Sequence, residues 1–160
     1  GHINQEEYKP MTTYSECEQT AIQVALAAIQ QTLNTNDVMA SSEQVRDYLT
    51  IQLAGEPDEW FGVMFLTSQH RLISFEKLFR GTVNSSYVHI RVIARKALEL
   101  NAAAVILTHN HPSGIAEPSS ADQQITTRIK DALDVFDIKV LDHFIVSSGD
   151  TCSFANRGMM

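Results

Sequence analysis

The sequence predicts an α/β fold, a sandwich in which helices flank a mixed β-sheet, with a helical extension on the N-terminal side. Apolar residues recur at helical spacing in residues 15–54, whereas short apolar runs alternate with helix-like segments from Trp60 onward. The run Ala103–Leu107 is short and entirely apolar, as in a central strand. With 160 residues, 44% of them hydrophobic, the chain can bury one core but is too short for two full domains.

Residues 12–54 are interpreted as the helical extension and are predicted to form two helices. The first begins at Ser15, which forms a capping-box pattern with Glu18, and continues to about residue 33. The second ends before Gly55. Residues 1–11 are interpreted as a tag or disordered start and carry no part of the functional prediction.

Residues 55–160 are predicted to form the α/β domain. In chain order we expect a hairpin, a helix, the central strand, a second helix and two closing strands. The expected segments are strands at Trp60–Leu66 and Leu72–Phe75, with Leu78–Thr82 continuing the sheet, a turn at 84–86, a helix at Val88–Leu98, the strand Ala103–Leu107, a helix that bears Ile125, Ile129, Leu133 and Phe136, and strands at Lys139–Val146 and Thr151–Phe154.

Composition restricts the classes of partner. The chain has 12 basic and 19 acidic residues, a net charge of −7, so direct binding to nucleic acid is not expected from charge. We expect a cytoplasmic protein without a membrane partner, because no apolar run reaches the roughly 20 residues that cross a bilayer and no secretion signal pattern opens the chain. Cys17 and Cys152 lack metal-binding or redox spacing, as is typical of free thiols in a reducing compartment.

The most informative segment follows the predicted central strand. His109 and His111 are two residues apart, so in an extended chain their imidazoles point to the same side. Asp122 is expected in the first turn of the next helix, where its carboxylate can face back toward the strand end. Two imidazoles and one carboxylate leave one tetrahedral position open, which is typical of catalytic Zn²⁺. The same ligand types also suit iron or manganese.

Hydrolysis at such a metal also requires a side chain that moves protons. Glu56 and Glu59 flank the first predicted strand. Glu59 stands at the strand entrance, from which its carboxylate can reach a neighbouring strand end, so we predict Glu59 as the general acid/base and keep Glu56 as the alternative.

Ser119 and His143 each have a plain structural interpretation. Ser119 precedes Asp122 by three residues, which is an ordinary helix N-cap pattern. Asp142 and His143 could hold a ligand imidazole in its tautomer, but His143 lies between Leu141 and Phe144 in a predicted strand and is interpreted as a buried strand residue outside the site.

The spacing of these residues resembles the JAMM motif of the JAB/MPN metalloproteases. That motif reads His-x-His, seven residues, then Ser-x-x-Asp, and is met by His109, His111, Ser119 and Asp122. The string from His109 to Gly114, with Pro118-Ser119 and Leu141-Asp142-His143, resembles the RadC-like branch of bacterial proteins. The similarity extends from about residue 54 to the end of the chain.

The resemblance implies a JAB/MPN sandwich, similar to the cytidine deaminase fold, and hydrolysis of a peptide or isopeptide bond in a peptide or protein substrate. It implies that His109, His111 and Asp122 hold Zn²⁺, that Glu59 is the general acid/base, and that Ser119 supports the oxyanion. The chain departs from the RadC-like pattern at Ile90-Arg91-Val92, where Pro-Arg-Glu is usual, and it lacks an evident helix-hairpin-helix segment.

Two other classes of function compete with the hydrolase. RadC-like proteins carry a DNA-repair label, which favours a protein that binds a partner or DNA without proteolysis, but the acidic charge balance argues against direct DNA contact. A metal-free JAB scaffold is the third class, and the presence of all three ligand types argues against it. The sequence does not specify an oligomeric state.

Overall fold

The computed structural model describes residues 14–53, 55–81 and 88–160. The elements in chain order are α1 (Glu16–Thr35), the 3-10 turn η1 (Val38–Ala40), α2 (Ser42–Leu53), β1 (Trp60–Leu66), β2 (Leu72–Arg80), α3 (Ile90–Glu99), β3 (Ala104–Asn110), α4 (Ser120–Asp134), β4 (Lys139–Ser147) and β5 (Asp150–Ser153). The interpretation of residues 1–11, the end of the predicted strand at Thr82 and the predicted turn at 84–86 lie outside the described residues.

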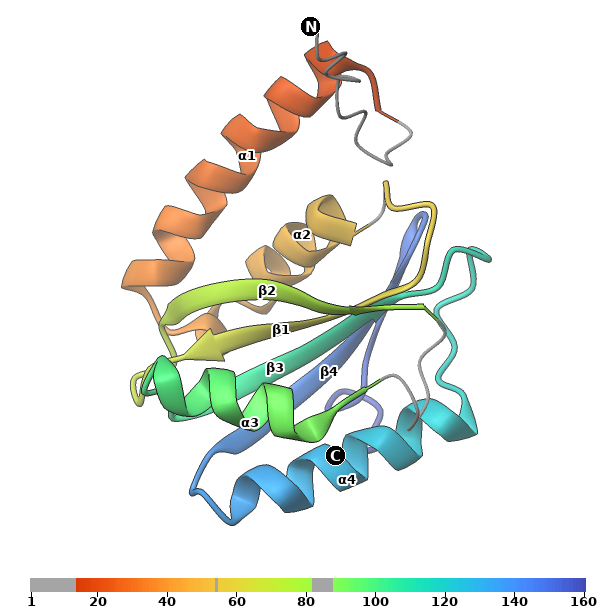
Figure 1. Ribbon diagram of the computed structural model, residues 1–160. Helices are drawn as coiled ribbons and strands as arrows, with labels where there is room; N and C mark the ends of the chain where they lie inside the picture. The colour runs from red at the N-terminus through yellow and green to blue at the C-terminus, as the bar shows by residue number, and fades with distance from the viewer. Residues whose placement is uncertain (1–13, 54, 82–87) are drawn as a thin grey trace, which may run out of the picture.

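The strands form one mixed sheet in the order β2-β1-β3-β4-β5, which Figure 1 shows in the middle of the molecule. β3 and β4 are parallel, and the other three neighbouring pairs are antiparallel. Parallel neighbours need a crossover connection, which α4 supplies. The ends of β3 and β4 therefore lie at the same edge of the sheet as the start of β1, where Phe61 pairs with His109.

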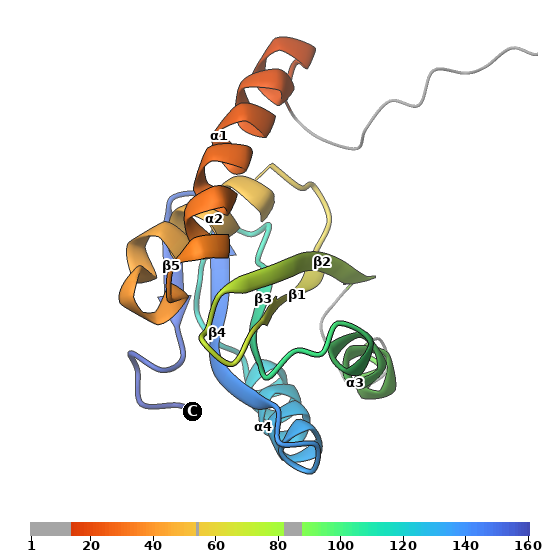
Figure 2. The same ribbon diagram turned by 90° about the vertical axis from the view of Figure 1, so that its left-hand side faces the viewer.

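Helices cover both faces of the sheet, as predicted. Figures 1 and 2 show α1 and α2 on one face and α3 and α4 on the other. Each face has its own apolar cluster. The cluster under α3 and α4 includes Phe61, Val105, Leu107, Ile93, Ile125 and Ile129. The cluster under α1 and α2 includes Met64, Ile106, Val146, Leu33, Leu49 and Leu53.

The Ser15 N-cap predicted for the first helix is present. The Glu18 amide donates to the Ser15 hydroxyl, and that hydroxyl donates to the Glu18 carboxylate. None of the helices in the described part of the chain combines the length and the hydropathy needed to cross a membrane.

Two strands are longer than the sequence predicts. β2 is continuous through Glu76 and Lys77, because it is an edge strand whose charges reach partners outside the sheet: Lys77 contacts Glu56 at 2.7 Å and Lys96 contacts Glu76 at 3.0 Å. β3 continues to Asn110, because this part of the strand pairs with β4.

An irregularity in β4 changes which side chains face which helix layer. Val105 and Ile106 are consecutive in β3, but their partners in β4 are Val140 and Asp142, so Leu141 is an extra residue. Val140 packs in the α3/α4 cluster, whereas Leu141 packs against the α1/α2 cluster. The bulge therefore shifts the alternation of β4 by one residue and turns His143 toward α4.

Candidate metal centre

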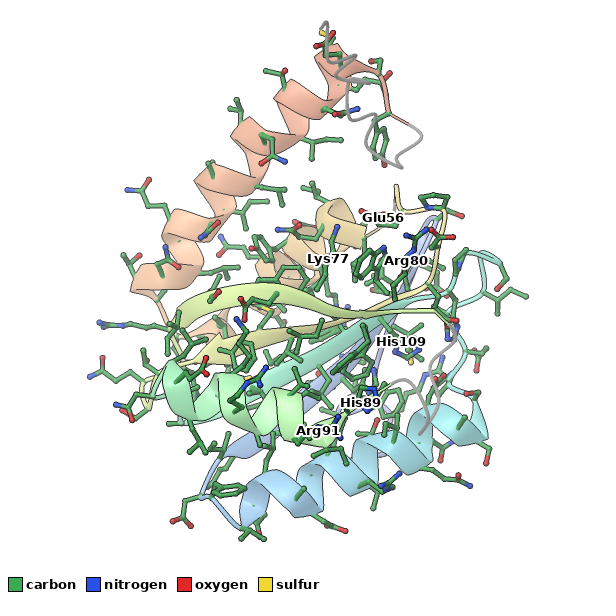
Figure 3. The ribbon with its side chains drawn as sticks, in the orientation of Figure 1. Glu56, Lys77, Arg80, His89, Arg91 and His109 are labelled. Carbon is green, nitrogen blue, oxygen red and sulfur yellow. The ribbon has the colours of Figure 1, made fainter. Side chains whose placement is uncertain are left out.

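His109 and His111 stand at the end of β3 with their rings together. Their Nε2 atoms are 2.9 Å apart, which agrees with the prediction that residues at spacing two share one side. His109 is fully buried and its ring stacks on Phe61, whereas the His111 side chain is 16% exposed. Figure 3 shows His109 on the opposite side of the sheet from Glu56 and Lys77. The two rings therefore extend from the buried interior, at His109, to the partly exposed surface, at His111.

Asp122 brings a carboxylate to both imidazoles from the first turn of α4. Its Oδ1 lies 3.2 Å from Nε2 of His109 and its Oδ2 lies 3.4 Å from Nε2 of His111. Burial raises the pKa of Asp122, but its contacts with the two histidines outweigh that effect and hold the pKa well below the usual range. The side chain is 3% exposed, so the carboxylate is an internal anion directed at two nitrogens.

His111 is oriented by the loop that follows it. Its Nδ1 lies 3.0 Å from the carbonyl oxygen of Ile115, which can only accept, so Nδ1 carries a proton and donates it. The contact with Asp122 raises the pKa of His111, burial opposes this, and the Ile115 hydrogen bond reinforces it. The remaining nitrogen, Nε2, faces His109 and Asp122.

Glu59, and not Glu56, lies beside the histidine pair. Oε1 of Glu59 is 3.9 Å from Nε2 of His111, and one donor atom from each of Glu59, His109 and His111 lies within 4.8 Å of the other two. Glu56 instead contacts Lys77, on the side of the sheet that α1 and α2 cover. Of the two glutamates that the sequence offered, only Glu59 is at a distance from which it can exchange protons within the site.

Asn110 holds the backbone on both sides of Glu59. The backbone N–H of Trp60 donates to Oδ1 of Asn110 at 2.7 Å, and Nδ2 of Asn110 donates to the carbonyl oxygen of Asp58 at 2.9 Å. The β1–β3 backbone ladder ends at Phe61, so the Asn110 amide extends the pairing by one side chain. Asn110 is not among the residues that the sequence predicts for the site, because its partners lie about fifty positions earlier in the chain.

His143 contacts His109 directly, and its interpretation as a strand residue outside the site left this contact out. Its Nε2 is 2.7 Å from Nδ1 of His109, and its Nδ1 is 2.6 Å from the hydroxyl of Thr126. Burial lowers the pKa of His143 well below its usual value. The residue is a buried strand residue, as predicted, but it also lies in the layer of side chains directly behind His109.

Ser119 forms the helix cap that its spacing predicts. Its hydroxyl accepts from the Asp122 amide at 3.0 Å, and its own amide donates to the Asp122 carboxylate at 2.8 Å. The residue is exposed, and a hydroxyl that accepts one bond still has its proton to donate. Capping therefore leaves the hydroxyl proton of Ser119 free to point toward the site.

The donor atoms suit zinc in kind and in spacing. Zinc binds imidazole nitrogen and carboxylate oxygen at about 2.0 to 2.2 Å, so two donors on a tetrahedral ion are about 3.3 Å apart. The separations among His109, His111 and Asp122 run from 2.9 to 3.4 Å. The three residues can thus converge on one ion with small movements of their side chains.

The fold and this cluster define the class of the protein: a mixed α/β sandwich with a candidate metal centre at the edge where β3 ends. The chain belongs to the RadC-like JAB domain family, which it matches over residues 39–159. The predicted resemblance is confirmed, and the match begins at residue 39, inside the predicted helical extension and earlier than the expected start near residue 54.

The similar proteins include three UPF0758 proteins. Those of Methylibium petroleiphilum and Pseudoalteromonas atlantica are each 50% identical, over 139 and 142 residues, and that of Stutzerimonas stutzeri is 48% identical over 142 residues. The matches cover 87% to 89% of this chain and 63% of each relative. The chain therefore spans less than two thirds of the length of these relatives.

Proposed function

We propose that the chain is a zinc-dependent metallohydrolase that cleaves a peptide or isopeptide bond in a peptide or protein substrate. The observation that carries the proposal is the meeting of two imidazoles with the carboxylates of Asp122 and Glu59 at one edge of the sheet. His109, His111 and Asp122 would hold the ion. Family membership supports this proposal, since the JAMM spacing of His109, His111, Ser119 and Asp122 lies within the matched residues.

Zinc, when bound, would polarise the scissile carbonyl and acidify a water molecule. In the proposed reaction, the water oxygen bonds to the carbonyl carbon, the C–N bond breaks, and the products are a carboxylate and an amine. Glu59 would take the proton from the attacking water and pass it to the leaving nitrogen, as a general base and then a general acid. Its side chain is 21% exposed, so it can reach both the buried ligands and a substrate from solution.

Ser119 would donate a hydrogen bond from its hydroxyl to the oxyanion that forms on the carbonyl. Its exposure and its free proton are compatible with this role. The cap that it forms would hold the hydroxyl beside the Asp122 ligand at the same time.

Metal content tests the centre of the proposal. Elemental analysis of the purified protein should find about one zinc per chain in the wild type, and none in His109→Ala or Asp122→Ala. Asp131→Ala, on the exposed side of the same helix, is the matched control and should keep the metal. A wild type that holds no metal after zinc is supplied would contradict the proposal.

A peptide-cleavage screen tests the chemistry. Zinc-loaded wild type should release new amino termini from a mixed peptide library, and Glu59→Gln should lose this activity while it keeps its zinc. Glu56→Gln is the matched control, because Glu56 contacts Lys77 and should be dispensable for cleavage. Equal cleavage by the wild type and Glu59→Gln would remove Glu59 from the mechanism.

A further inference from the structure

We infer that Thr126 and His143 form a hydrogen-bond relay that keeps a proton on Nδ1 of His109 and so turns the Nε2 lone pair of that ring toward the metal centre. Both would be positioning residues, since neither contacts the ion. The value of the relay to a metal ligand rests on the proposed function, whereas the direction of its hydrogen bonds follows from the contacts alone.

The direction is set at Thr126. Its Oγ1 lies 2.6 Å from the backbone carbonyl oxygen of Asp122 and 2.6 Å from Nδ1 of His143. A carbonyl can only accept, and a hydroxyl has a single proton. Thr126 therefore donates to Asp122 and accepts from His143, which places a proton on Nδ1 of His143.

The second step passes through the His143 ring. The ring is fully buried, stacked on Phe154 and edge-on to Phe61, an environment that disfavours a charged imidazolium. A neutral imidazole with its proton on Nδ1 has a lone pair on Nε2. That atom lies 2.7 Å from Nδ1 of His109, so Nδ1 of His109 must be the donor.

The third step gives the consequence for the site. With the proton on Nδ1, the lone pair of His109 lies on Nε2, 2.9 Å from Nε2 of His111. Oδ1 of Asp122 lies 3.2 Å from the same nitrogen and, without an ion, favours a proton there, so the relay acts against the Asp122 contact. A relay of the opposite direction would put the proton of neutral His109 on Nε2, where it would occupy the ligand position. Each of the two histidines therefore donates its Nδ1 proton to an acceptor behind it. His109 donates to His143, and His111 donates to the Ile115 carbonyl oxygen.

Nitrogen NMR of the metal-free wild type tests the direction of the bonds without a variant. Long-range proton–nitrogen correlation separates protonated from unprotonated ring nitrogens. We expect a protonated Nδ1 and an unprotonated Nε2 in His143, and a protonated Nδ1 in His109. A proton on Nε2 of His143 would overturn the relay, whether or not the protein binds zinc.

Zinc affinity tests what the relay does for the ligand. Thr126→Val keeps the shape of this buried side chain but removes its oxygen, and we expect about 10- to 100-fold weaker zinc binding. It should also populate the Nε2-protonated form of His109 in the metal-free protein. Thr126→Ser restores the hydroxyl and should restore both the affinity and the nitrogen spectrum.

Thr127→Val is the matched control. It removes an equivalent hydroxyl one position further along α4, which bonds to the Gln123 carbonyl on the exposed side. Equal zinc affinities of the Thr126→Val and Thr127→Val proteins would overturn the supporting role. A wild type that shows the expected nitrogen spectrum but binds no zinc would contradict the proposed function and leave the relay standing.

Discussion

The two faces of the sheet use their buried polar side chains differently. On the face that α4 covers, ring nitrogens of His109 and His143 and the carboxylate of Asp122 face one another. On the face that α2 covers, the polar atoms of Asn110 and Asp142 bond mainly to backbone N–H and carbonyl groups. Neighbouring residues of β3 and β4 therefore divide between a candidate reactive cluster and the support of the chain around it.

The largest expected effect on stability comes from the face that α2 covers, where Asn110 and Asp142 bond to the backbone. Asp142 is buried and accepts from the Ser153 hydroxyl and from the amides of His143 and Ala155. Asp142→Ala leaves these donors without a partner, and we expect a loss of about 3 kcal/mol in the free energy of unfolding, measured by urea denaturation.

Asp142→Asn sharpens this result. The amide oxygen can still accept from backbone N–H groups, and the Ser153 hydroxyl can rotate to accept from the amide nitrogen. We expect a smaller loss of stability than in Asp142→Ala. Equal losses in the two variants would mean that packing, and not hydrogen bonding, is the contribution of Asp142.

Zinc should stabilise the protein through the other face only. Binding to the folded state alone adds about 2.7 kcal/mol when free zinc exceeds its dissociation constant 100-fold. Unfolding with and without a chelator should show this difference in the wild type and in Asp131→Ala, and no difference in Asp122→Ala. A zinc-dependent gain that survives in Asp122→Ala would place the ion elsewhere.

Asn110 links the two faces of the sheet. Its side chain lies on the face that α2 covers, but it holds the backbone on both sides of Glu59, which belongs to the candidate metal centre. Asn110→Ala should lower the free energy of unfolding by about 2 kcal/mol and speed hydrogen exchange of the Trp60 amide, while zinc content stays at one per chain. Thr108→Val is the control. Thr108 lies on the same strand as Asn110, and its buried hydroxyl donates to the Phe144 carbonyl oxygen and not to a group near Trp60. Unchanged hydrogen exchange of the Trp60 amide in Asn110→Ala would contradict a role of Asn110 in holding the start of β1.

The smallest effect on stability is expected from an exposed ion pair, between Arg157 and Glu117. The Arg157 guanidinium makes two hydrogen bonds to the exposed Glu117 and holds the pKa of that carboxyl below its ordinary value. Because the folded-state pKa is lowered, the contribution is present above the unfolded pKa and is lost as pH falls through the folded pKa. Arg157→Gln should therefore be slightly less stable than wild type near pH 7 and equal to it in acid, by thermal unfolding. A difference that persists in acid would be due to packing.

The meeting of His109, His111 and Asp122 could be predicted because its geometry is local. The strand period fixes the common side of His109 and His111, and the Ser119 cap fixes the turn of helix on which Asp122 lies. Glu59 was found from its place at a strand entrance, but its preference over Glu56 depended on the pairing of β1 with β3. That pairing joins residues almost fifty positions apart.

His143 shows where prediction from pattern fails. Strict alternation from Val140 would point His143 toward α2, and the extra residue Leu141 reverses this. A bulge leaves no clear mark in an apolar strand, so from the sequence a contact between His143 and a ligand imidazole was only the less favoured alternative. The same limit applies to Thr126, whose partner His143 lies on another element.

The sequence by itself determined the α/β class, the boundaries of most helices and the residues that can bind a metal, because periodicity, capping and side-chain chemistry act over a few neighbouring residues. The tertiary structure alone decided that Glu59 joins the histidines, that Asn110 holds it there, and that His143 stands behind His109. These contacts depend on strand order, register and one bulge, which are set by the packing of the whole sheet between its two helix layers.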